Sequence, residues 1–196
     1  MKVLFAVLSY LLGAVPTGYL VFKLSERKDI RQFGSRNTGA TNVLRLKGLK
    51  LAVPVVLADV LKGFLPPFLA FRLFGDPRLA LIASFLAVVG HCYPVYIRFR
   101  GGKGVATTVG AAAALVFAPF LVSVTVFLVV VGLTRYISLS SILAVISLPL
   151  FVHVFGGGVE TVVWGIAIAV LVVFKHRGNI GRLLAGRERK LGEKAL

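Results

Sequence analysis

The chain has 196 residues, of which 58% are hydrophobic and only 15% are charged. Soluble domains are about half apolar and about a quarter charged, so this composition excludes a soluble domain and predicts an integral membrane protein. The length predicts a single domain over residues 1–196. The one cysteine, Cys92, excludes an intrachain disulfide. The net charge of +16 is distributed between apolar runs, which favours lipid headgroups and anionic substrates over nucleic acid as binding partners.

Seven apolar runs are candidates for membrane-spanning helices, and the predicted fold is therefore an all-α integral membrane protein with seven transmembrane helices. The runs are Val3–Leu24, Leu51–Phe74, Leu79–Ile97, Gly104–Ala118, Pro119–Thr134, Ser138–Phe155 and Val159–Lys175. The first run resembles a signal peptide but has no clear cleavage site, so we expect it to be retained. The fourth and fifth runs could form one helix kinked at Pro119. That helix would be about 46 Å long against a hydrocarbon core of about 30 Å, so we expect a break at Ala118-Pro119.

The distribution of basic residues predicts the orientation of these helices. With seven spans, 19 of the 23 Lys and Arg residues fall on one side of the membrane. The positive-inside rule places that side in the cytoplasm, with the N-terminus outside and the C-terminus cytoplasmic. Three polar stretches, residues 34–45, 99–108 and 176–188, then share the cytoplasmic face, where we expect the active site.

The middle stretch is rich in glycine and contains a lysine, in the order Gly101-Gly102-Lys103-Gly104. Glycines let backbone N–H groups approach a small anion, because no Cβ blocks the way. A helix beginning near Gly104 would direct the positive end of its dipole at the same point. The pattern favours a phosphate-binding loop at a membrane surface. The alternative is a plain basic loop between two membrane helices.

The first and third stretches carry further groups that bind phosphate or transfer protons. The first offers hydroxyl and amide side chains followed by Arg45, namely Ser35, Asn37, Thr38, Thr41 and Asn42. Capping and turn formation are the alternative roles for such residues. In the third stretch His176 and Asn179 are three positions apart and would share a helix face. A histidine beside cations can act as base, acid or neutral donor. Glu188 can be a site residue, or an anion that holds the nearby arginines together.

Three ionisable residues fall within or near predicted spans. Asp59 and Lys62 are one helical turn apart inside the second span, where a neutralised ion pair is favoured over a role in the site. His91, near the cytoplasmic end of the third span, either orients the glycine-rich loop or is a buried histidine of the core. No cluster of His, Cys and carboxylate residues has the spacing of a metal site, so neither a metal nor another cofactor is predicted.

Taken together, the three stretches resemble one family, the bacterial membrane acyl-phosphate:glycerol-3-phosphate acyltransferases of the PlsY type. The resemblance covers the blocks G-S-x-N-x-G-A-T-N-x-x-R, G-H-x-x-P…F-x-G-G-K-G-V-A-T and H-x-x-N-I-x-R-L-x-x-G-x-E, which occur in this order. It implies seven helices, no acyl-CoA or acyl-carrier-protein donor, and lysophosphatidic acid as the product. The functional positions implied by the three blocks are Ser35, Arg45, Gly101, Gly102, Lys103, Gly104, His176, Asn179 and Glu188.

The resemblance predicts transfer of a fatty acyl group from acyl phosphate to the sn-1 hydroxyl of glycerol-3-phosphate, in the bacterial cytoplasmic (inner) membrane. It also implies coupling to an enzyme that forms acyl phosphate. Membrane lipids are the other expected partners. We expect Asn37, Thr41, Asn42 and Thr107 to contribute to substrate binding beside the implied positions. A transporter for phosphorylated anions and a structural scaffold are the rival functions.

Acyl phosphate is a mixed anhydride with a good leaving group, so catalysis reduces to positioning and charge stabilisation. We expect Lys103 and the glycine-rich loop to hold one phosphate and Arg45 with Arg182 to hold the other. Ser35 and Asn179 would orient the attacking hydroxyl or the developing oxyanion. His176 would be the general base, or would only bind while the donor's phosphate oxygens accept the proton.

Overall fold

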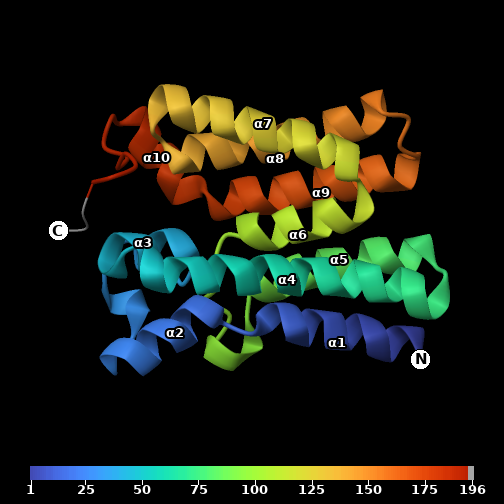
Figure 1. The fold of residues 1–196 in the computed structure, drawn as a ribbon, viewed down its shortest axis with the longest axis horizontal. Helices are drawn as coiled ribbons and strands as arrows, with labels where there is room; N and C mark the ends of the chain where they lie inside the picture. The colour runs from blue at the N-terminus through green and yellow to red at the C-terminus, as the bar shows by residue number, and fades with distance from the viewer. Residues whose placement is uncertain (194–196) are drawn as a thin grey trace.

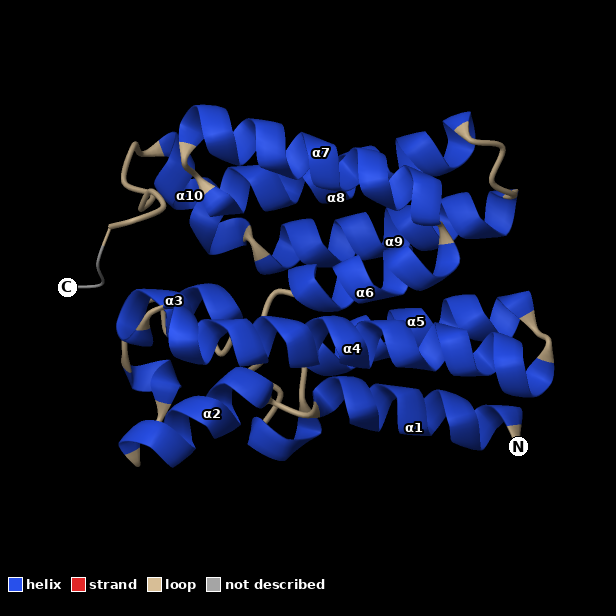
Figure 2. Ribbon diagram, in the orientation of Figure 1, coloured by secondary structure: helices blue, strands red, loops and turns tan. Residues whose placement is uncertain are grey.

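The computed structural model describes residues 1–193, and this range is helical apart from its turns and loops (Figure 1, Figure 2). Ten α-helices lie within it: α1 (Lys2–Ala14), α2 (Thr17–Glu26), α3 (Ala40–Lys47), α4 (Leu49–Phe74), α5 (Pro77–Cys92), α6 (Val105–Leu115), α7 (Phe117–Thr134), α8 (Ile137–Val154), α9 (Val159–Lys175) and α10 (Arg177–Leu184). Two short 3-10 helices, η1 (Ile30–Gln32) and η2 (Val95–Ile97), lie in the connections.

Five helical segments of the described chain are long and apolar enough to cross a membrane, and a sixth qualifies if a bent pair is counted as one span. The five are Lys2–Glu26, Leu49–Phe74, Pro77–Ile97, Phe117–Thr134 and Ile137–Val154. The bent pair is α9 with α10, which meet at 61°. The predicted fourth span is represented by α6, whose 11 residues extend only about 16 Å. The structure therefore supports five to six spans by length, and the count of seven stays a prediction.

The helix breaks differ from the predicted ones in a way that local chemistry explains. The first predicted helix is divided into α1 and α2 at Val15-Pro16, because a proline cannot continue the hydrogen bonding of the preceding turn. The break between α6 and α7 lies at Val116 instead of Ala118-Pro119. Pro119 falls in the first turn of α7, where its missing N–H costs no intrahelical bond.

The helices form two groups with α6 between them. Figure 1 shows α1 to α5 on one side and α7 to α10 on the other. α6 packs on α4, α5 and α7. Its crossing with α4 is close because an added Cβ at Gly63 would overlap the Thr107 carbonyl, and one at Gly110 would overlap the Val60 carbonyl. The largest buried apolar cluster joins α5, α6, α8 and α9, with Val88, Ala111, Leu148 and Ile168 among its members.

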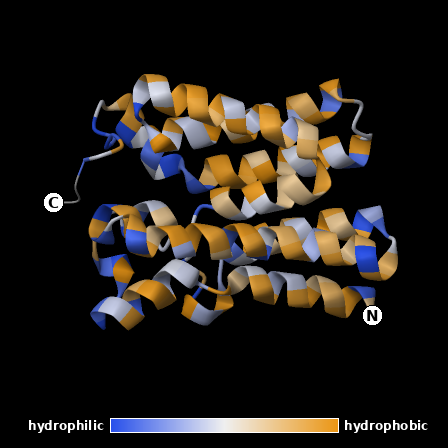
Figure 3. Cartoon of the chain, in the orientation of Figure 1, coloured by the Kyte–Doolittle hydropathy of each residue, from blue (hydrophilic) through white to orange (hydrophobic). Residues whose placement is uncertain are grey.

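Polar residues gather mainly at one end of this bundle. Figure 3 shows most of the hydrophilic residues at the end that carries α2, α3 and α10, with the N-terminus at the opposite end. Helix α6 begins well inside the bundle, away from that polar end, so the glycine-rich loop before it is recessed (Figure 1). The fold thus brings a polar loop into the interior of an otherwise apolar assembly.

Candidate active site

The three polar stretches meet at the polar end of the bundle, as the sequence predicts. The amide of Asn37 donates to the carbonyl of Gly101 at 3.4 Å, which joins the first stretch to the glycine-rich loop. The guanidinium of Arg45 donates to the carbonyl of Arg189 at 3.3 Å, which joins α3 to the segment that follows α10. These contacts connect residues 64 and 144 positions apart in the chain.

The glycine-rich loop is shaped by its packing on α5. The N–H of Gly102 donates to the carbonyl of His91 at 3.0 Å, so this N–H is not available to an anion as the sequence led us to expect. An added Cβ at Gly101 would overlap the His91 carbonyl and the Pro94 ring, and one at Gly102 would overlap Nε2 of His91. Gly104 has φ of +88° and precedes the first turn of α6. The first two glycines are therefore required by close contact, and Gly104 by its backbone conformation.

Two cations lie at the centre of the site. Burial lowers the pKa of Lys103 to about 8, and the positive charges of Arg182 and Arg45 add to this, whereas Glu188 opposes it. Burial also lowers the pKa of Arg45, although an arginine stays protonated at any physiological pH. Lys103 is thus partly desolvated and has neighbours of the same charge, which disfavour its own positive charge. This site is therefore electrostatically prepared for an anion.

Glu188 organises the third stretch. One carboxylate oxygen accepts from Asn179 Nδ2 at 2.6 Å and from the Ser138 hydroxyl at 2.9 Å, and the other accepts from Arg182 Nε at 2.7 Å. Burial acts to raise the pKa of Glu188, but the hydrogen bonds from Asn179, Arg182 and Ser138 outweigh it and the pKa is lowered. Glu188 is therefore an ionised bridge between α8, α10 and the following segment, in line with the predicted role of holding a neighbouring arginine.

His176, which follows α9, has one ring nitrogen committed to the backbone. Its Nδ1 lies 2.7 Å from the carbonyl of Val172, and because a carbonyl can only accept, Nδ1 carries the proton. Burial lowers the pKa of His176 to about 4, with a further contribution from the positive charge of Lys103. The ring is therefore neutral at pH 7, and its Nε2 has a free lone pair.

The first stretch contains both framework and cavity residues. Asn42 is 1% exposed, and its side chain accepts from the N–H of Ser35 and donates to the carbonyls of Phe33 and Asn37. Its amide thus builds the turn that presents Ser35, a role that the prediction of substrate binding did not include. Asn37 accepts from the N–H of Gly39 at 2.9 Å.

One cavity of about 470 Å³ connects these groups. Of the predicted residues, it is lined by Ser35, Asn37, Thr41, Asn42, Arg45, Lys103, Gly104, His176, Asn179 and Glu188. Gly101, Gly102, Thr107 and Arg182 do not line it. Thr107 is fully buried, and its backbone packs on Gly63. Thr108, which was not among the predicted site residues, lines the cavity in its place.

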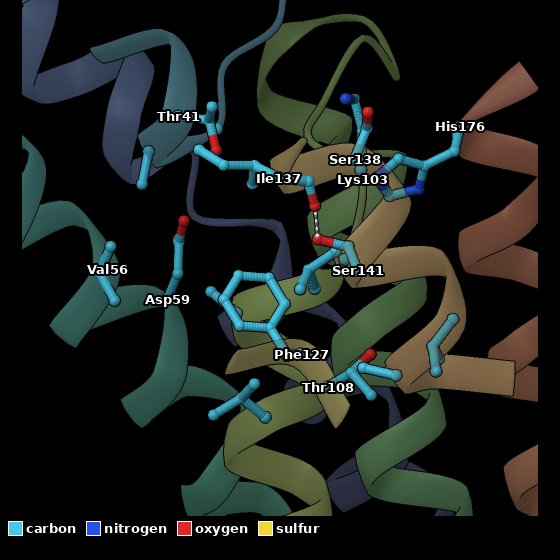
Figure 4. A pocket seen from close by; sticks show the side chains of 18 of the residues that line it. Thr41, Val56, Asp59, Lys103, Thr108, Phe127, Ile137, Ser138, Ser141 and His176 are labelled. Carbon is cyan, nitrogen blue, oxygen red and sulfur yellow. Dashed lines mark hydrogen bonds between the residues drawn. The ribbon is translucent and has the colours of Figure 1, made fainter. Parts of the chain in front are cut away.

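The remaining wall of the cavity is mostly apolar and comes from α4, α6, α7 and α8. Figure 4 shows Val56 and Asp59 on one side, with Phe127, Thr108 and Ser141 projecting toward the same space. The hydroxyl of Ser141 donates to the carbonyl of Ile137 at 2.8 Å. Ser138 and Ser141 were missed by the sequence argument, although the serine-rich start of Ser138-Leu139-Ser140-Ser141 after a basic residue was a usable signal.

Comparison with known proteins decides the family. The family model described as glycerol-3-phosphate acyltransferase matches residues 3–186. The chain belongs to the glycerol-3-phosphate acyltransferase family. A curated glycerol-3-phosphate acyltransferase of Endomicrobium trichonymphae is 40% identical over 190 residues, covering 97% of this chain and 96% of that protein. That of Alkaliphilus metalliredigens is 43% identical over 188 residues, covering 95% and 94%.

Two solved structures agree with the assignment to the glycerol-3-phosphate acyltransferases. The crystal structure of PlsY (YgiH) in its glycerol 3-phosphate form has a TM-score of 0.93 and 42% identity, covering 97% of this chain and 96% of that one. The lysophosphatidic acid form has a TM-score of 0.90 and 40% identity, covering 97% and 95%. The protein is therefore an acyltransferase and a multi-pass integral membrane protein, and the family resemblance drawn from the three motifs is confirmed.

Proposed function

We propose that the protein transfers a fatty acyl group from acyl phosphate to the sn-1 hydroxyl of glycerol-3-phosphate, giving lysophosphatidic acid and inorganic phosphate. The observation that carries this proposal is that one cavity has a polar end and an apolar end. Arg45, Lys103 and His176 line the polar end, and side chains such as Phe120 and Phe127 line the apolar part. A phosphorylated headgroup and a fatty chain would occupy these two parts together.

The chemical step needs no covalent acyl-enzyme. The sn-1 oxygen attacks the acyl carbonyl carbon and forms the ester bond, the bond from that carbon to the phosphate oxygen breaks, and phosphate leaves. Lys103 and Arg45 are placed to bind phosphate oxygens, and their charge stabilises the leaving group. Ser35, an exposed residue that lines the cavity, would orient a substrate oxygen. The carboxylate of Glu188 acts through Asn179 and Arg182.

The proton of the attacking hydroxyl goes to the donor's phosphate oxygens, with His176 as a hydrogen-bond acceptor. Since the pKa of His176 is lowered to about 4, the neutral ring is a weak base at pH 7. Its Nε2 can still accept a hydrogen bond from the hydroxyl and fix its direction. Of the two roles that the sequence left open, we therefore propose orientation in preference to general base catalysis.

We also propose the cellular setting. A single domain with seven membrane segments, the short α6 included, would have its N-terminus outside and its C-terminus and site at the cytoplasmic face of the bacterial inner membrane. The charge bias of the sequence supports this orientation. Acyl phosphates hydrolyse readily, so coupling to an enzyme that forms them would deliver the donor before it is lost.

The test uses purified protein in detergent micelles, where transport has no meaning. Palmitoyl phosphate and glycerol-3-phosphate are supplied, and lysophosphatidic acid and released phosphate are measured. We expect equal amounts of both products, and loss of product formation in Lys103→Met but not in Lys50→Met, which removes an exposed lysine at the start of α4. Phosphate release without lysophosphatidic acid, or equal use of an acyl thioester donor, would refute the proposed reaction.

A further inference from the structure

A buried group of three ionisable residues lies beside the glycine-rich loop, and two of them, Asp59 and His91, also line the cavity. Asp59, Lys62 and His91 are 2%, 5% and 8% exposed. The Lys62 ammonium lies 2.7 Å from a carboxylate oxygen of Asp59 and donates to the carbonyl of Val15 at 2.9 Å, at the break between α1 and α2. The predicted ion pair is therefore present. The same carboxylate oxygen of Asp59 lies 3.7 Å from Nδ1 of His91.

His91 connects this ion pair to the loop through two different contacts. Its carbonyl accepts from the N–H of Gly102 at 3.0 Å. Its ring lies against the same residue, because an added Cβ at Gly102 would overlap Nε2. The backbone and the imidazole of His91 thus both contact Gly102, the residue immediately before Lys103. Lys103 has no other side chain of its own loop to fix its position, since its neighbours on both sides are glycines.

We propose that His91, oriented by the Asp59–Lys62 ion pair, is a positioning residue that holds the glycine-rich loop so that Lys103 projects into the cavity. The carboxylate beside Nδ1 orients the ring and favours the tautomer with its proton on Nδ1, which leaves Nε2 against the loop. This inference deepens the proposed function and rests on it, because the loop matters only if its lysine binds a phosphorylated substrate.

The alternative is that the three residues only brace the bundle. An ion pair alone would explain Lys62 and its bond to Val15. It does not explain why the pair lies next to a histidine ring. Nor does it explain why that ring is packed so closely on Gly102 that no side chain fits there. Nδ1 of His91 has no hydrogen-bond partner, because the Asp59 oxygen 3.7 Å away is ion-paired with Lys62 instead. A buried polar atom without a hydrogen-bond partner costs free energy, so an apolar side chain at position 91 would stabilise the helix packing better than histidine does.

The first experiment compares two conservative replacements of His91 with a matched control. Glutamine can place its amide near the position of Nε2, against the loop, whereas asparagine reaches only the position of Nδ1. Ser84→Ala is the control. Ser84 is on the same helix as His91 and is fully buried, and its hydroxyl donates only to the carbonyl of Leu81 in that helix. For each variant, kcat, the KM of both substrates and the inhibition constant of inorganic phosphate are measured in detergent.

A displaced phosphate-binding group should weaken phosphate binding before it changes stability. In His91→Asn we expect the KM of one phosphorylated substrate and the inhibition constant of phosphate to rise together by about tenfold or more, with kcat changed less. In His91→Gln both constants should stay much closer to the wild-type values, and in Ser84→Ala they should equal them. Wild-type constants in both His91 variants would overturn the proposal. Absence of turnover in wild type would instead refute the proposed function.

A second experiment gives an answer even if the His91 variants do not fold. The double variant Asp59→Asn, Lys62→Met removes both charges at nearly constant volume, so it leaves no unpaired ion in the bundle. We expect it to fold, with the same rise in KM as His91→Asn, and an unchanged KM would overturn the proposal. A double-mutant cycle tests the contact between Gly102 and the His91 ring. Gly102→Ala should raise KM about tenfold less in the His91→Ala background than in wild type, and equal rises in the two backgrounds would show that the two residues do not interact.

Discussion

The lowered pKa of Lys103 predicts a specific dependence of the reaction on pH. With a pKa of about 8, the ammonium is about 90% protonated at pH 7 and only about 10% protonated at pH 9. The pKa is below its ordinary value, so the positive charge is present at low pH and is lost as pH rises through 8. Because kcat/KM reports the free enzyme, it should fall about tenfold between pH 7 and pH 9 if phosphate binding requires the charge.

The assay follows lysophosphatidic acid formation at low substrate concentration over pH 6–9.5, with a blank for spontaneous hydrolysis of acyl phosphate. Lys103→Arg is the control, since a guanidinium keeps its proton throughout this range. Its kcat/KM should be lower overall but level from pH 7 to 9. A level profile in wild type, or the same fall in Lys103→Arg, would show that the charge of Lys103 does not set the rate.

Three further outcomes follow from the contacts of single residues. Glu188→Gln should lower the free energy of unfolding by about 2 kcal/mol, measured as a lower Tm in detergent, because an amide donor would face Arg182 Nε. His176→Ala should retain measurable turnover, and the wild-type rate should be level from pH 6 to 7; a rise with a midpoint near 6.5 would point to a histidine base. Gly63→Ala should destabilise the protein by more than about 2 kcal/mol, because its Cβ would overlap the Thr107 carbonyl of α6, whereas Gly132→Ala, which meets open space, should not.

The placement of the three polar stretches at one end of the bundle could be predicted, because it depends on the lengths of the apolar runs and the positions of the basic residues along the chain. Membrane spans are set by the length of apolar runs, and the side on which each connection lies follows from the number of crossings and the positions of Lys and Arg. Lys103 and His176 each adjoin the end of a predicted span, and Arg45 lies shortly before the second, so the predicted order of spans places all three on one side of the membrane. The shared membrane face could therefore be predicted, and the structure adds that the three residues line one cavity.

Other features could not be predicted because they depend on contacts between distant segments. The glycines 101 and 102 have the composition of an anion-binding loop, but their close packing on His91 and Pro94 is a property of the folded chain. The same holds for Asn42, whose amide builds a turn across several residues. The short α6 is a third case, because hydropathy gives apolar length and not the position at which a helix begins within the bundle.

If Lys103 binds a substrate phosphate as proposed, the electrostatics of the site imply that this substrate prepares the site for its own reaction. Without substrate, Lys103 is in a partly desolvated place beside Arg45 and Arg182, which lowers its pKa. A bound phosphate brings two negative charges to the same place, and a nearby opposite charge favours the protonated form. The pKa of Lys103 must then rise when substrate binds, so kcat at saturation should stay level at pH values where kcat/KM already falls. A parallel fall of both would mean that Lys103 does not contact the bound phosphate.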